Sequence, residues 1–117
     1  MHIGDLAAAT GLSLRTIRHY DDIGLLPATS RSGGGFRIYT EADLQRMLVI
    51  RSMKPLGFSL EEMAELLDAV DILASAPEDA GAREKLADYL QRAQRKREKM
   101  AVNLARADTF ISDLARL

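Results

Sequence analysis

The chain has 117 residues, of which 47% are hydrophobic and 28% charged, and its net charge is −1, so it fits one small domain with an extension. It contains no cysteine, which excludes disulfides, thiolate metal sites, iron–sulfur clusters and thiol redox switches. No apolar run approaches the roughly 20 residues that span a bilayer, and no signal peptide is evident, so we expect a cytoplasmic protein with no membrane partner.

Two short helices are predicted at the start of the chain. The first covers Ile3–Thr10 and is ended by Gly11. Ser13 can cap the second helix, which runs from Leu14 to about Ile23 and is ended by Gly24. Two helices joined by so short a turn are typical of a helix-turn-helix.

The spacing of three residues supports that motif. Ala7 lets the second helix cross closely above the first, and Gly11 tolerates the positive φ of the tight turn. Ile17 then packs the second helix against the first, and Leu14 and part of Tyr20 also face inward. This spacing alone is only moderately specific, because many small helical pairs carry alanine and glycine by chance.

A β-hairpin is predicted over residues 28–39, where turn-forming residues lie between short extended arms. The turn formers are Ser30, Ser32, Gly33, Gly34 and Gly35. A third helix begins at Thr40, and a capping box formed by Ser59 and Glu62 starts a fourth, in which Leu60 faces inward. Residues 74–81 form a connector.

The remaining residues, 82–117, contain no helix breaker and predict one long helix of on the order of 50 Å. Its apolar residues follow an unbroken heptad spacing in which Arg97 is the one charged member. We expect a second copy of the chain to cover this seam, and the competing interpretation is a helix folded back on its own domain. The predicted dimerisation residues are Leu86, Leu90, Ala93, Met100, Leu104, Ala107, Ile111 and Leu114.

Charge is strongly segregated along the chain, with a net +2 over residues 1–58, −7 over 59–81 and +4 over 82–117. A nucleic-acid binder needs local positive charge rather than a basic average, so the near-neutral total does not count against DNA. The second helix displays polar residues on its outward face. Arginine can form two hydrogen bonds to a guanine in the major groove. These residues are Ser13, Arg15, Thr16, Arg18 and His19. The competing interpretation is a solvated helix face.

The hairpin adds a second candidate grip, because glycines let a backbone approach phosphates closely and arginine supplies charge. Arg31, Arg37 and Tyr39 lie where the edge of a wing would flank the second helix. A glycine-rich turn alone is weak evidence, but directly after a helix-turn-helix it indicates a winged DNA-binding domain.

Residues 2–70 resemble the MerR family of bacterial transcription regulators almost without a gap. The resemblance rests on five motifs, Ile-Gly-Asp-Leu-Ala (3–7), Thr-Gly-Leu-Ser-Leu-Arg-Thr-Ile-Arg-His-Tyr (10–20), Asp-Asp-Ile-Gly-Leu-Leu-Pro (21–27), Phe-Arg-Ile-Tyr (36–39) and Leu-Gly-Phe-Ser-Leu-Glu-Glu (56–62). Residues 82–117 match this family in architecture but in no diagnostic motif.

The resemblance implies a mainly α fold: a winged helix-turn-helix head with a second helical pair (1–73), the connector, and an antiparallel coiled-coil dimerisation helix (82–117). It also implies a homodimer that distorts a long-spacer promoter so that RNA polymerase can use it, and hence an activator. A related repressor or architectural DNA binder, and a protein-interaction module using only the coiled coil, are the alternatives.

By position, the resemblance implies DNA contacts from the second helix, the wing and the end of the third helix. These are Arg15, Thr16, Arg18, His19 and Tyr20, then Arg31, Gly35, Arg37 and Tyr39, then Arg51 and Lys54. Burial in the core is the alternative for Tyr20, and a structural role for Arg51 and Lys54. No nucleophile–base pair, phosphate loop or metal cluster indicates an enzyme, a metal or a cofactor, and the sequence names no inducer.

Overall fold

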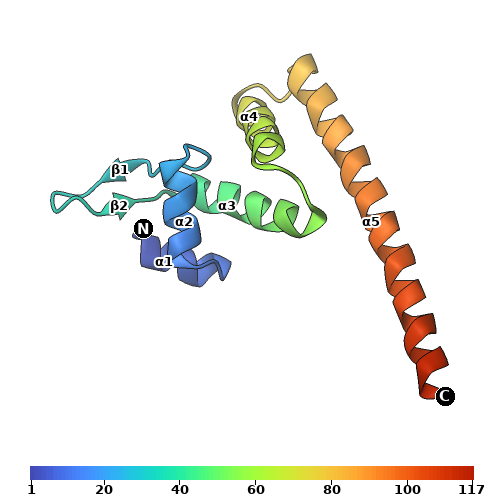
Figure 1. The fold of residues 1–117 in the computed structure, drawn as a ribbon. Coiled ribbons are helices and arrows are strands. Elements are labelled where there is room, and N and C mark those ends of the chain that lie inside the picture. Colours follow the sequence, from blue (N-terminus) through green and yellow to red (C-terminus); the bar gives the residue numbers. More distant parts are fainter. The chain divides into compact units, whose positions relative to one another are not determined.

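The computed structural model describes all of residues 1–117, which form two compact units, Met1–Asp68 and Ala69–Leu117. In the first unit are the helices α1 (Ile3–Thr10), α2 (Leu14–Asp22) and α3 (Glu41–Met53), the strands β1 (Ser30–Arg31) and β2 (Arg37–Ile38), and the 3-10 helix η1 (Lys54–Leu56) (Figure 1). Helix α4 (Leu60–Ser75) crosses the boundary, and α5 (Ala80–Ala115) completes the second unit. The boundary between the two compact units therefore falls inside α4.

The joint between α1 and α2 is a helix-turn-helix, as predicted. Gly11 has a φ of 74°, and its backbone N–H donates to the Ala7 carbonyl at 2.8 Å. Ser13 caps α2 by accepting a hydrogen bond from the Thr16 backbone N–H at 3.1 Å. Ile17 is fully buried, as is Leu6, so α2 is anchored through one face and displays the other.

Two apolar residues predicted to face inward are exposed instead. Leu14 and Leu60 are the first residues of α2 and α4, and both side chains are exposed to solvent. A helical side chain leans toward the turn that precedes it. Since the first residue of a helix has no preceding turn, its side chain extends beyond the packed face, and the prediction for both leucines was wrong.

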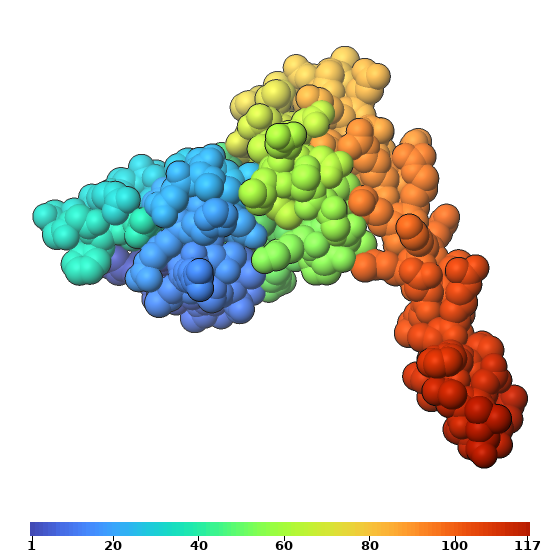
Figure 2. All heavy atoms as spheres, viewed as in Figure 1, coloured from blue at the N-terminus to red at the C-terminus, as the bar shows by residue number.

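The hairpin is a two-stranded antiparallel sheet that protrudes beside the blue surface of α1 and α2 (Figure 2). Its register pairs Ser30 with Ile38 and Arg31 with Arg37. The turn is closed by the Ser32 N–H, which donates to the Phe36 carbonyl at 2.8 Å. The predicted wing is confirmed, with strands of only two residues each.

Helix α5 is 36 residues long, about 54 Å at 1.5 Å per residue. It begins two residues before the predicted start, because the Asp79 carboxylate accepts the Ala82 N–H at 2.8 Å and caps an earlier turn. Ala82 and Tyr89 are buried, whereas every residue from 97 to 117 is exposed. None of the helices in the chain combines the length and the hydropathy that crossing a bilayer requires.

A candidate DNA-binding interface

The outward face of α2 carries two arginines that no acidic residue neutralises. Arg15 and Arg18 are exposed, and neither forms an ion pair. His19 is exposed beside them, with its ring 6.1 Å from that of Tyr20. Thr16 is partly covered, and its hydroxyl accepts a hydrogen bond from the Ser13 hydroxyl at 2.9 Å. This face therefore offers two free guanidinium groups and an imidazole to a ligand.

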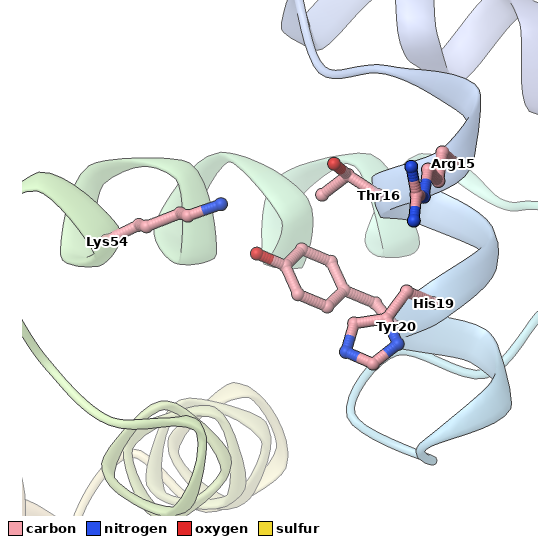
Figure 3. A pocket seen from close by; sticks show the side chains of 5 residues that line it. All are labelled: Arg15, Thr16, His19, Tyr20 and Lys54. Atoms are coloured by element: carbon pink, nitrogen blue, oxygen red, sulfur yellow. The ribbon is translucent and has the colours of Figure 1, made fainter.

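An open cleft of ≈ 330 Å³ adjoins the same face and joins α2 to the end of α3. Figure 3 shows Lys54, at the start of η1, directed into the cleft from the side opposite α2. The Tyr20 ring is buried, but its hydroxyl points into the cleft toward the Lys54 side. Arg15, Thr16 and His19 complete the lining. The structure thus brings Lys54 into one surface with the α2 residues.

The wing arginines, in contrast, are engaged by acidic residues of α2. Arg37 donates from Nε to Asp21 Oδ2 at 2.6 Å and from Nη2 to Asp22 Oδ1 at 3.3 Å. Arg31 Nη2 lies 3.6 Å from Asp21 Oδ2, and Arg31 Nη1 donates to the Gly35 carbonyl at 3.1 Å. Arg31 keeps about half of its side chain exposed, whereas Arg37 is largely covered.

The charges of this cluster stabilise one another. Burial alone raises the pKa of Asp21. This effect is outweighed by the hydrogen bonds from Arg37 and the Ala28 N–H and by the positive charges of Arg37 and Arg31. The pKa of Asp21 is therefore below its ordinary value. The hydrogen bond to Asp21 in turn raises the pKa of the Arg37 guanidinium. Both groups are therefore ionised at neutral pH.

Tyr39 was predicted to be a wing contact, and the structure contradicts this. Its side chain is 1% exposed, and its hydroxyl is buried without a hydrogen-bond partner. Two backbone hydrogen bonds with Met1, at 2.7 and 2.6 Å, hold Tyr39 inside the head. Burial raises the pKa of the phenol. Tyr39 is therefore a core residue, and a phosphate outside the protein cannot reach its hydroxyl.

Arg51 is partly committed to a structural contact. Its Nη1 donates to the Thr10 carbonyl at 3.0 Å, at the end of α1. A cation at the C-terminal end of a helix stabilises the unpaired carbonyls there. Of the two residues predicted at the end of the third helix, only Lys54 therefore lies in the cleft beside α2.

Two functional candidates in the wing region were missed in the sequence. Phe36 lies at the wing tip with 69% of its side chain exposed, and a Cβ on Gly34 would come within 3.2 Å of its ring. A phenylalanine inside a glycine-rich turn is a signal that the sequence does contain. Asp43 is buried at the start of α3 and accepts hydrogen bonds from the Thr29 hydroxyl at 2.6 Å and the Thr40 N–H at 2.9 Å. These two partners lie at the two ends of the hairpin.

The heptad seam of α5 is exposed along most of its length. Its large apolar members beyond Leu86 are 47% exposed or more, namely Leu90, Met100, Leu104, Ile111 and Leu114. A soluble protein rarely leaves so continuous an apolar stripe to solvent. The predicted dimerisation residues are therefore available to a partner.

Two family profiles match the chain. The profile described as "MerR HTH family regulatory protein" matches residues 1–70, and the one described as "MerR, DNA binding" matches residues 44–110. The mercuric resistance operon regulatory protein of Serratia marcescens is 41% identical over 112 residues, which cover 96% of this chain and 72% of that protein. The nodulation protein NolA of Bradyrhizobium sp. (strain NC92) is 47% identical over 66 residues, 56% of this chain. The chain spans only 28% of the length of NolA.

Solved structures agree with these matches. HiNmlR, a MerR family regulator lacking the sensor domain and bound to promoter DNA, aligns with a TM-score of 0.73 and 26% identity over 97% of this chain and 86% of that chain. PbrR691 from Ralstonia metallidurans, in complex with lead(II), aligns with a TM-score of 0.59 and 35% identity over 99% of this chain and 86% of that chain.

Proposed function

Because the chain belongs to the MerR family of regulatory proteins, we propose that it binds promoter DNA as a homodimer and activates transcription. The observation that carries the proposal is the pair of unneutralised arginines, Arg15 and Arg18, on the exposed face of α2. The second helix of a helix-turn-helix enters the major groove, where a guanidinium can bond to guanine O6 and N7. His19 and Thr16 flank these arginines on the same helix.

The contacts to phosphates come from the wing and from the cleft. We assign phosphate contacts to Lys54 and the Tyr20 hydroxyl, because both face the cleft beside α2. Arg31, with half of its guanidinium side chain exposed, and the backbone around Gly35 contact the flanking phosphates. We also assign Phe36 to the interface, because it is 69% exposed in the turn of the wing. Phosphate contacts fix the register and orientation, while the α2 side chains select the sequence.

The homodimer forms through α5, and its charge pattern favours the antiparallel arrangement. Residues 92–99 carry five basic and one acidic side chain, and Arg97 occupies a seam position. In a parallel pair, each Arg97 would face the other, and the two basic segments would lie side by side. In an antiparallel pair centred on Met100, the middle of the seam, each Arg97 would instead lie opposite the part of the other copy around Leu104, and the two basic segments would be offset along the axis.

The dimer acts on the promoter by deforming it. Two heads joined by a stiff coiled coil hold the DNA at separated half-sites, and phosphate contacts on both sides supply the energy to bend and untwist the segment between them. RNA polymerase then reads both promoter elements across a spacer that is otherwise too long. RNA polymerase is therefore an indirect partner, because the protein acts on it through the promoter DNA. We assign no inducer, because the chain has no cysteine to supply a thiolate ligand and no other group in it indicates one.

The binding proposal is tested by fluorescence anisotropy with a labelled fragment of the promoter nearest the gene. If Arg31 and Lys54 of both protomers each neutralise one phosphate, the slope of log K against log salt is about −4. Arg18→Ala should weaken binding by about 1–3 kcal/mol. Arg106→Ala is the matched control, because it removes the same charge from an exposed position on α5. Equal losses for the two variants would contradict the role of α2.

The activator proposal is tested by in-vitro transcription on two templates. We expect the protein to raise transcript yield on the long-spacer promoter and to have little effect once the spacer is shortened to the length that polymerase reads unaided. A fall in yield on both templates would indicate a repressor. DNA bending without any rise in yield would indicate an architectural protein.

A further inference from the structure

A single carboxylate at the end of α2 holds the wing from three points. Asp21 Oδ1 accepts the Ala28 N–H at 3.0 Å, ahead of β1. Asp21 Oδ2 accepts Arg37 Nε at 2.6 Å, from β2, and lies 3.6 Å from Arg31 Nη2, from β1. The Asp21 side chain is only 13% exposed. Its partners thus span the entry to the hairpin and both of its strands.

The pairing register of the hairpin makes this carboxylate necessary. Arg31 and Arg37 are direct cross-strand partners, and like charges directly opposite each other in a sheet are destabilising. Asp21 contacts both guanidinium groups through the same oxygen, so its negative charge offsets part of their repulsion. The hairpin has only two residues in each strand, and its ladder alone therefore gives it little rigidity.

We propose that Asp21 is a positioning residue for DNA binding: it joins the wing to the recognition helix so that both reach the duplex as one rigid unit. This inference rests on the proposed function. In this arrangement the positive charge of Arg37 is used mainly inside the protein, and Arg31 remains the wing cation available to a phosphate. Asp21 acts through these arginines and through Ala28, and it does not touch DNA.

The direction in which one substitution changes the DNA affinity distinguishes this proposal from a simple charge effect. Asp21→Asn removes a negative charge from a DNA-binding surface, so charge alone predicts tighter binding. The positioning role predicts weaker binding, by tenfold or more, with loss of the flanking footprint that the wing protects. Asp22→Asn is the matched control, since Asp22 is 67% exposed, makes only the 3.3 Å contact with Arg37, and loses the same charge. Its affinity should be unchanged or higher. An affinity for Asp21→Asn equal to or above that of the wild type overturns the proposal.

A double-mutant cycle tests the route through Arg37. If Asp21 acts on DNA binding mainly through Arg37, adding Asp21→Asn to an Arg37→Gln background should lower affinity less than threefold further. Full additivity of the two losses would overturn that route. The cycle is measured in the same anisotropy assay, after thermal unfolding has shown that each variant is folded.

A measurement on the free protein tests the positioning role of Asp21 independently of whether the protein binds DNA. Hydrogen exchange of the hairpin amides in the free protein reports whether the wing is held. The Ser32 and Gly35 amides, which bond across the turn, should exchange at least fivefold faster in Asp21→Asn than in Asp22→Asn. Unchanged exchange overturns the positioning role even if the wild type binds DNA. Faster exchange in a protein that binds no promoter upholds the coupling while the proposed function fails.

Discussion

Replacing Asp43 with asparagine should destabilise the head and loosen both ends of the wing. The buried carboxylate accepts the Thr29 hydroxyl at 2.6 Å and the Thr40 N–H at 2.9 Å, and Arg46 Nη1 lies 3.4 Å from its other oxygen. An asparagine can present its carbonyl oxygen to Thr29 and Thr40, but its amide N–H₂ then faces the Arg46 guanidinium. The variant therefore loses the ion pair, and two charge-assisted hydrogen bonds become neutral ones.

The magnitude follows from these contacts. A hydrogen bond to a charged group contributes about 1.5–3 kcal/mol and a neutral one about 0.5–1.5 kcal/mol, so weakening two of them costs about 2 kcal/mol. For a chain of this size, that lowers Tm by on the order of 8 °C. Urea and thermal unfolding at one fixed protein concentration measure the loss.

The matched control is Glu41→Gln, in the same first turn of α3. Glu41 is exposed, and its one hydrogen bond is from Gln45 at 3.5 Å, so its neutralisation should cost about 0.5 kcal/mol or less. Both variants lose one negative charge near the same helix N-terminus, and the helix-dipole contribution is therefore common to them. If Asp43→Asn proved no less stable than Glu41→Gln, the structural role of this carboxylate would be refuted.

Three further predictions concern other parts of the chain. Gly11→Ala should cost about 1–2 kcal/mol in urea unfolding, because the φ of 74° is strained for alanine although nothing lies within 4 Å of the added Cβ; a loss no larger than that of Gly4→Ala would contradict this. Arg97→Leu should lower the dimer dissociation constant tenfold or more in sedimentation equilibrium, because a leucine completes the apolar seam; weaker dimerisation would argue against the seam. Asp21 has a lowered pKa in the folded state, so its stabilisation is fully present above the unfolded pKa of about 4 and is lost as pH falls through the folded pKa. The stability gap between the wild type and Asp21→Asn should consequently narrow in acid, and a gap that widened below pH of about 4 would contradict the ion pair.

The features that the sequence predicted well are set by neighbouring residues. Three local features within seven positions define the helix-turn-helix: the positive φ of Gly11, the helix cap formed by Ser13 and the buried apolar side chain of Ile17. The capping box of Ser59 and Glu62 is confirmed by reciprocal bonds of 2.8 and 3.1 Å. Turn and cap chemistry of this kind depends on local backbone geometry, so a single sequence is enough to identify it.

The features that the sequence could not predict depend on contacts between distant residues. The ion pair of Arg37 with Asp21 spans 16 positions, and the bond of Asp43 with Thr29 spans 14. Neither pairing has a periodic signature, so Arg37 was expected to be a free phosphate contact. Tyr39 was misassigned for a related reason, since its burial depends on the N-terminal segment pairing with the end of the hairpin.

The solvent exposure of residues 97–117 has a consequence for how the protein responds to its own abundance. A lone helix with residues 97–117 uncovered is marginal in water, so in the proposed dimer this segment gains its order only when two chains meet. At concentrations below the dissociation constant, the population of paired chains then grows with the square of the amount synthesised. A modest change in expression would be amplified into a larger change in promoter occupancy, without any small molecule taking part.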